Sequence, residues 1–275
     1  MLAGGLGGLV GVGGGIILVP GLIWAAGLDR HTATGTSLLA ILPVAVVGSL
    51  TYALAPDGVF DPAASALLTA GSLGGAILGA RTNAVLSERA LRIGFAALSA
   101  VMGVRLVVPL GLGAGSDELA LHAGTIVELV ALGLAGGFLS GLMGVGGSAI
   151  VIAIMVLTLD TSQAFSQGIA LAAVIPTVIV GSVVHHELGS LAPRIGLTAG
   201  LIGAVGAIPG ALAALALPSE ALRTTFGVFL LVSAARMLLA ERARRKAAHR
   251  RCHSRPPTLV KGVETTQEER MTDGR

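Results

Sequence analysis

The 275-residue chain is too apolar and too poor in charge to be an ordinary soluble domain. Hydrophobic residues make up 53% of it and charged residues 12%, against roughly a quarter charged in soluble domains. Its mean hydropathy is +0.87. Of the 18 Lys and Arg residues, ten follow residue 240, so the preceding body is nearly free of charge. A lipid bilayer can accommodate this much apolar side chain and a soluble core cannot, so the composition predicts a polytopic integral membrane protein.

Eight apolar segments follow one another along the chain, each with the roughly 20 residues that cross a bilayer. They cover residues 2–28, 33–55, 63–86, 90–112, 123–159, 164–184, 195–217 and 221–240. The sequence therefore predicts an all-α membrane fold. We expect a first transmembrane repeat over 1–112, an external linker over 113–122, a second transmembrane repeat over 123–240 and a disordered, basic cytoplasmic tail over 241–275.

The two halves of the chain carry the same motifs in the same order. Residues 11–15, Gly-Val-Gly-Gly-Gly, return after a shift of 133 as residues 144–148, Gly-Val-Gly-Gly-Ser. The same shift relates Gly35 to Gly168, Pro43 to Pro176 and Gly48 to Gly181. An ordered series of matches indicates an internal duplication. Many transporters are built in this way, with the substrate site between the repeats.

The distribution of Lys and Arg favours a hairpin at the start of each half. With the basic tail inside and eight simple spans, the loop that carries Arg81, Arg89 and Arg92 falls outside, against the positive-inside rule. With a hairpin that enters and leaves on one side, this loop moves inside, the acidic linker lies outside, and only Arg223 is misplaced. Each half then holds one hairpin and three spans. Because three is odd, the two repeats are inverted.

Segment lengths agree with these hairpins. Residues 123–159 are too many for one span, and their Gly-Val-Gly-Gly run lies where a turn is needed. Only ten residues precede Gly11, so the first leg is short and we expect the natural chain to begin further upstream. A cleavable signal peptide is not expected, because no basic region precedes the first apolar segment.

The two glycine turns form the candidate substrate site. Non-helical backbone at membrane depth requires protein or a water cavity around it, and helices that begin there present free N–H groups that attract anions. Short polar side chains after each hairpin would add hydrogen bonds. The candidate substrate-binding residues are Gly13, Gly14, Gly15, Thr34, Thr36, Ser37, Gly146, Gly147, Ser148, Ser166 and Gln167, and Pro43 and Pro176 are expected to kink the helices that follow. The structural alternatives are close helix packing by the glycines and helix capping by the hydroxyl groups.

No motif indicates catalysis, a metal or a cofactor. The run His185-His186-Glu187 lies in a predicted loop without a Cys/His cluster, and the first glycine run lacks the Lys-Ser or Lys-Thr of a phosphate loop. Isolated Ser and His residues without an elbow motif do not make a hydrolase. We therefore expect no enzyme activity, no cofactor and no metal. The basic tail is expected at anionic lipid headgroups rather than on nucleic acid.

The glycine-rich motifs resemble those of the sulfite exporter TauE/SafE family of bacterial membrane transporters, over about residues 1–240. The resemblance rests on residues 4–20, on Ala33-Thr34-Gly35-Thr36-Ser37, and on residues 136–147. The chain departs from a strict repeat at Ser148, which stands where the first turn has Gly15, and at Ala153, which stands where the first half has Pro20. The resemblance implies a cell-membrane carrier of sulfite, sulfonates or related organosulfur anions, driven by a proton or another gradient.

The sequence thus predicts an exporter of small anions that works by alternating access. We expect a multi-pass protein of the inner or plasma membrane with a cytoplasmic C-terminus. A passive anion channel would share the same amide-lined site and is kept as an alternative. A membrane enzyme acting on lipid phosphates would need Glu, Arg or His beside the turns, and none lies within several residues of them. The sequence carries no signature of a particular coupling ion or oligomeric state.

Overall fold

The computed structural model describes the chain except for residues 56–59, 83–87, 109–114, 144–146 and 254–275. The helices among these described residues are, in chain order, α1 (Leu2–Val10), α2 (Gly15–Ala26), α3 (Arg30–Ala53), α4 (Pro62–Thr82), α5 (Glu88–Val107), α6 (Ala123–Met143), α7 (Ser148–Thr158), α8 (Gln163–Glu187), α9 (Pro193–Ala216) and α10 (Ser219–His253). Apart from one isolated backbone bridge between Ser116 and Thr161, the described residues are helical or in turns. The predicted all-α fold is confirmed.

Six of these helices are long and apolar enough to cross a membrane, namely α3, α4, α6, α8, α9 and α10. The apolar parts of α5 (Ile93–Val107) and α7 (Ser148–Thr158) are shorter. We expected a full span over 90–112. The helix that covers it starts with the charged residues Glu88, Arg89 and Arg92, which shorten its apolar part. The predicted multi-pass membrane protein is confirmed, with fewer long spans than apolar segments.

Each half of the chain begins with two helices separated by a glycine-rich stretch of sequence. These are α1 with α2 and α6 with α7, and three longer helices follow each pair. With 12 and 11 residues, α2 and α7 are too short to cross a bilayer. The helix after each pair is capped at matching positions. Asp29 accepts the Thr32 N–H at 3.2 Å at the start of α3, and Ser162, 133 residues later, accepts the Phe165 N–H at 3.2 Å at the start of α8.

The helices pack in pairs that join the two halves. Helix α1 lies against α9 and α6 against α4, while α3 packs on α8 and α5 on α10. If the second half is laid over the first in chain order, the pair of α1 and α9 maps onto that of α6 and α4, while the other two pairs map onto themselves. Such pairing is what an approximate two-fold axis between the halves would produce. It supports the inverted repeat, which we keep as a proposal.

Glycine allows two of these helix pairs to approach backbone to backbone. A Cβ at Gly75 of α4 would lie 2.1 Å from the carbonyl oxygen of Leu134 in α6, and a Cβ at Gly210 of α9 would lie 2.1 Å from that of Gly5 in α1. Small residues give helices in lipid a large contact area at short distance. These crossings hold the hairpin of each half against the long helices of the other half.

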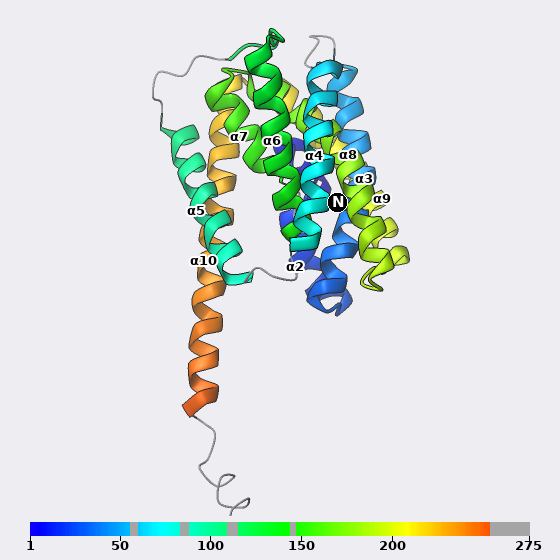
Figure 1. Cartoon of the computed structure of the whole chain (residues 1–275), viewed down its shortest axis with the longest axis vertical. Coiled ribbons are helices and arrows are strands. Elements are labelled where there is room, and N and C mark those ends of the chain that lie inside the picture. Colours follow the sequence, from blue (N-terminus) through cyan, green and yellow to red (C-terminus); the bar gives the residue numbers. More distant parts are fainter. Residues whose placement is uncertain (56–59, 83–87, 109–114, 144–146, 254–275) are drawn as a thin grey trace, which may run out of the picture.

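Figure 1 shows α6 and α7 in the upper part of the molecule and α2 in the lower part. We call the upper end, which holds residues 115–122, the linker end. We call the opposite end, toward which α10 extends, the tail end (Figure 1). Helix α7 is buried over most of its length, so this short helix lies inside the protein rather than against lipid.

Cysteine labelling tests this arrangement in a membrane. In a Cys252→Ser background, we expect Glu118→Cys at the linker end to react with a membrane-impermeant maleimide in intact cells. We expect His186→Cys at the tail end to react only after permeabilisation, because both side chains are exposed but lie at opposite ends. Labelling of both cysteines in intact cells would contradict the hairpin arrangement.

Candidate functional site

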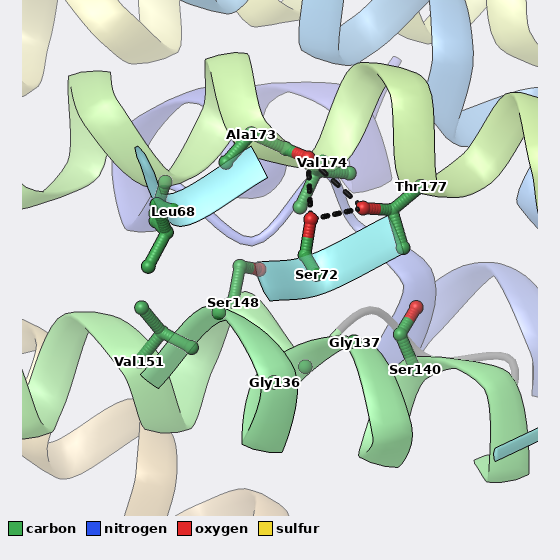
Figure 2. A pocket seen from close by; sticks show the side chains of 13 residues that line it. Leu68, Ser72, Gly136, Gly137, Ser140, Ser148, Val151, Ala173, Val174 and Thr177 are labelled. Atoms are coloured by element: carbon green, nitrogen blue, oxygen red, sulfur yellow. Dashed lines mark hydrogen bonds between the residues drawn. The ribbon is translucent and has the colours of Figure 1, made fainter. Parts of the chain in front are cut away.

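A small cavity lies beside the second glycine turn, where α4, α6, α7 and α8 meet (Figure 2). Its lining residues are Leu68, Ser72, Gly133, Gly136, Gly137, Ser140, Gly147, Ser148, Val151, Ala170, Ala173, Val174 and Thr177. The cavity volume is about 20 Å³, enough for about one water molecule. A larger ligand therefore requires these helices to move apart by a small amount.

The lining is mainly apolar, contains four hydroxyl groups and carries no charged side chain. Ser72 Oγ and Thr177 Oγ1 lie 2.8 Å apart, and Thr177 donates to the carbonyl oxygen of Ala173 at 3.0 Å. Figure 2 shows Ser72 of α4 pointing toward Thr177 of α8. This hydrogen bond joins the two halves across the cavity. Ser140 of α6 supplies a third hydroxyl group, and Ser148 the fourth.

Ser148 differs from Ser72 and Thr177 because its hydroxyl group has no partner among the described residues. Its side chain is 4% exposed, and its Oγ makes no hydrogen bond within the described part of the chain. Ser148 is the first residue of α7, and Gly147, in the capping position before it, has no side chain that could cap the helix. A buried hydroxyl group thus lies beside the first N–H groups of a helix, which carry a partial positive charge. These groups are uncharged hydrogen-bond donors, of the kind that can interact with an anion.

The second turn is also a place of very close packing. A Cβ at Gly147 would lie 1.8 Å from the carbonyl oxygen of Gly136, and one at Gly136 would lie 2.4 Å from the side chain of Val151. The two legs of this hairpin therefore touch through backbone atoms. Gly147 thus allows the close packing of the two helices and also lines the cavity. Gly146, another predicted site residue, lies outside the described residues.

The first glycine turn is described completely and needs its glycines for their backbone conformation. Gly11, Gly13 and Gly14 have φ of 72°, 66° and 80°, which other residues rarely adopt. Gly14 precedes α2 in the capping position, and Gly15 is the first residue of that helix. None of Gly13, Gly14 and Gly15 lines the cavity. The predicted turn is present, and the cavity lies at the other one.

The Gln167 side chain of α8 contacts both the first turn and Tyr52 of α3. Its side chain is fully buried and would collide with a Cβ at Gly11, at 2.6 Å. The Tyr52 hydroxyl group lies 2.7 Å from Gln167 Oε1 and 3.1 Å from the carbonyl oxygen of Gly8. A hydroxyl group has one hydrogen, so it donates to one of these oxygens at a time. Gln167 Nε2 has no partner among the described residues.

Thr34, Thr36 and Ser37 lie elsewhere, at the start of α3 near the tail end. Thr36 Oγ1 accepts the Ala192 N–H at 3.0 Å, which holds the start of α9 against α3. Ser37 donates to the carbonyl oxygen of Thr34 at 2.7 Å. These hydrogen bonds match the structural alternative given for the polar residues, and none of the three residues lines the cavity.

Ser166 also bonds locally and does not line the cavity. It donates to the carbonyl oxygen of Ser162 at 2.9 Å and lies 2.8 Å from Thr161 Oγ1. Among the described candidates, Gly147 and Ser148 are thus the residues that line it. Pro43 and Pro176 lie inside α3 and α8, which continue as helices on both sides. The kinks predicted there stay predictions.

Sequence reasoning missed Ser72, Ser140, Thr177 and Tyr52. A comparison of the repeats contains a signal for two of them. With the shift of 133, Ser140 corresponds to Gly7 and Thr177 to Val44, so the second half has hydroxyl groups where the first has none. Tyr52 is the only tyrosine in the chain and lies in an apolar segment, and these two facts could have identified it as a candidate site residue. Ser72 becomes visible only once α4 is known to pack on α6 and α8.

The long apolar helices and the buried short helix α7 define a multi-pass membrane protein. The chain belongs to the sulfite exporter TauE/SafE family, whose model matches residues 1–106 and 129–263. No curated protein and no solved structure matches the chain. The family membership confirms the resemblance in the sequence. It indicates a membrane exporter of sulfite or related anions rather than an enzyme.

Proposed function

We propose that this protein exports a small oxyanion, sulfite or a sulfonate, and that the anion binds in the cavity at the second glycine turn. The observation that carries the proposal is the Ser148 hydroxyl group, which is buried at the uncapped start of α7 and has no partner within the part of the chain that the structure describes. An unsatisfied buried polar group costs about 1–3 kcal/mol, so a ligand that completes its hydrogen bonds explains its presence. The family membership supports the choice of ligand.

The chemistry of the lining suits binding followed by release. An oxyanion that leaves water must replace its hydration shell, and the donors here are the first N–H groups of α7 with the hydroxyl groups of Ser140 and Ser148. Ser72 and Thr177 donate to carbonyl oxygens of their own helices in this conformation and would turn to the anion when the cavity widens. Hydrogen bonds to a charged group are worth about 1.5–3 kcal/mol each. Without a Lys or Arg in the lining, the anion is held by neutral donors and can leave again.

Alternating access would open this cavity to one end of the protein at a time. Helix α4 belongs to the first half, whereas α6, α7 and α8 belong to the second, so movement of one half against the other changes the cavity directly. The hydrogen bond between Ser72 and Thr177 lies across this boundary. We propose that it breaks when the cavity widens to admit an anion.

We propose that the first turn also lies on the path that the anion takes through the protein. Gly13, Gly14 and Gly15 would present N–H groups of α2 when the halves move, and Gln167 would add its free amide hydrogens. The tail-end residues Thr34, Thr36 and Ser37 would act indirectly, because their hydrogen bonds hold α3 to the start of α9. We propose the cytoplasmic side for the tail end, since the basic residues after Glu241 follow α10 in that direction.

Counterflow in proteoliposomes tests the proposal and separates a carrier from a channel. Vesicles with the purified protein and a high internal concentration of unlabelled sulfite should transiently accumulate radiolabelled sulfite from outside, and a channel would not produce this overshoot. Sulfate, thiosulfate and methanesulfonate as competitors would define the substrate class. Absence of any labelled uptake above protein-free vesicles for all of these anions would contradict the proposed function.

A further inference from the structure

Two glutamine side chains on α8 continue the line of the cavity toward the linker end. Gln163, Gln167, Ala170, Val174 and Thr177 follow one another at spacings of three or four residues, so they share one face of the helix. The last three line the cavity. Gln167 contacts Gly11 in the first turn, and Gln163 lies one helical turn further on, at the start of α8.

Both glutamines are buried with unused hydrogen-bonding groups. Gln163 is 1% exposed, and neither its Oε1 nor its Nε2 has a partner within the described part of the chain. Gln167 is fully buried, and its Nε2 has no partner there either. Nearly all buried polar groups in proteins are hydrogen-bonded. The three amide atoms without a partner among the described residues, both of Gln163 and Nε2 of Gln167, lie on the same helix face and therefore require an explanation.

We infer that the side-chain amides of Gln163 and Gln167 form a second oxyanion site, on the route between the cavity and the linker end. This inference rests on the proposed function. Each amide nitrogen offers hydrogens that bind an oxyanion without a permanent charge. The two residues are about 6 Å apart along the helix axis, and Ala170 at the cavity is about 4.5 Å beyond Gln167. An anion can thus exchange donors stepwise along this face of α8.

The linker covers the outer end of this route. The Ser116 N–H donates to the carbonyl oxygen of Asp160 and the Ser162 N–H donates to that of Ser116, both at 2.8 Å. The Ser162 hydroxyl group donates to the carboxylate of Asp117. Ser116 and Asp117 are exposed, whereas Thr161 and Ser162 beneath them are buried. The second site is therefore closed to water in this conformation, and an anion passes it when these bonds open.

Gln163→Leu tests the second site, because leucine has a similar size and no hydrogen-bonding group. We expect the initial rate of sulfite counterflow to fall at least tenfold. Thermal stability should stay equal or rise, because the substitution removes an unpaired buried amide. Equilibrium binding of radiolabelled sulfite to the detergent-solubilised protein should stay within about twofold, since the cavity donors are unchanged.

Ser182→Ala is the matched control. Ser182 lies on the same helix and is also buried without a partner, but it is about 100° away from Gln163 around the axis. Its loss should leave counterflow unchanged. If Gln163→Leu does not fold, Gln163→Met provides a second apolar variant of similar length.

The outcomes separate this inference from the proposed function. Normal counterflow in Gln163→Leu would overturn the second site and leave the cavity in place. A parallel loss of stability, binding and transport would also overturn it, because it would mark a structural role. If the unsubstituted protein neither binds nor transports sulfite or the competing anions, the proposed function fails and this site fails with it.

Discussion

Gly147→Ala is expected to destabilise the protein strongly, although it adds a single methyl group. The backbone of Gly147 has φ of −70°, which alanine adopts readily, so conformational strain is not the reason. The reason is that the new Cβ would lie 1.8 Å from the carbonyl oxygen of Gly136 and 2.6 Å from its carbon. Backbone atoms of α6 cannot rotate away as a side chain could, so the two legs of the hairpin must separate.

We expect a loss of about 3 kcal/mol or more, at the upper end of overpacking effects, and a fall in the thermal midpoint of roughly 10 °C. Thermal unfolding of the purified protein in detergent measures this fall in the thermal midpoint. Gly124→Ala is the control in the same hairpin, because nothing lies within 4 Å of a Cβ there. A Gly147→Ala protein with the stability of Gly124→Ala would show that this packing does not hold the second turn.

Ser148→Ala is expected to weaken sulfite binding roughly tenfold to a hundredfold while leaving the protein as stable as before. The binding loss follows from one hydrogen bond to a charged ligand, about 1.5–3 kcal/mol. Stability should not fall, because the hydroxyl group has no partner within the described residues that could be lost. Equilibrium binding of radiolabelled sulfite and thermal unfolding would be measured on the same preparation.

Ser99→Ala serves as the control for this substitution. Ser99 in α5 is likewise buried and unpartnered, but it does not line the cavity. Its removal should change neither binding nor stability. Unchanged sulfite affinity in Ser148→Ala would exclude the start of α7 as the binding site and direct attention to the first turn.

Much of the architecture could be predicted because it depends on local sequence. The glycine runs at 11–15 and 144–148 mark turns that need unusual backbone or close contact, and the position of the arginines favours hairpins over simple spans. Helix ends were less predictable. Helix α10 continues to His253, through the first part of the segment expected to be disordered, because Ala, Arg, Lys and Glu sustain a helix in water as well as in lipid.

The cavity could be predicted only in part, because it depends on which helices meet. Ser and Thr residues in membrane helices often bond to the preceding turn, and Thr36 and Ser166 show that their hydroxyl groups also serve tertiary and local contacts. Sequence spacing cannot tell such residues from Ser72, whose neighbour Thr177 is 105 residues away. The glycine motif identified Ser148 because the turn itself brings that residue to the cavity.

The length of α10 has a mechanical consequence. Its 35 residues span about 53 Å, whereas the hydrocarbon layer of a bilayer is about 30 Å thick. The apolar part ends at Arg242, and the remaining turns to His253 extend about 17 Å further. A rigid stalk of this kind holds whatever follows it away from the headgroups. A partner protein that binds the end of this helix would contact it in the aqueous phase. A tilt of α10 within the membrane would displace its C-terminal end further than its apolar part.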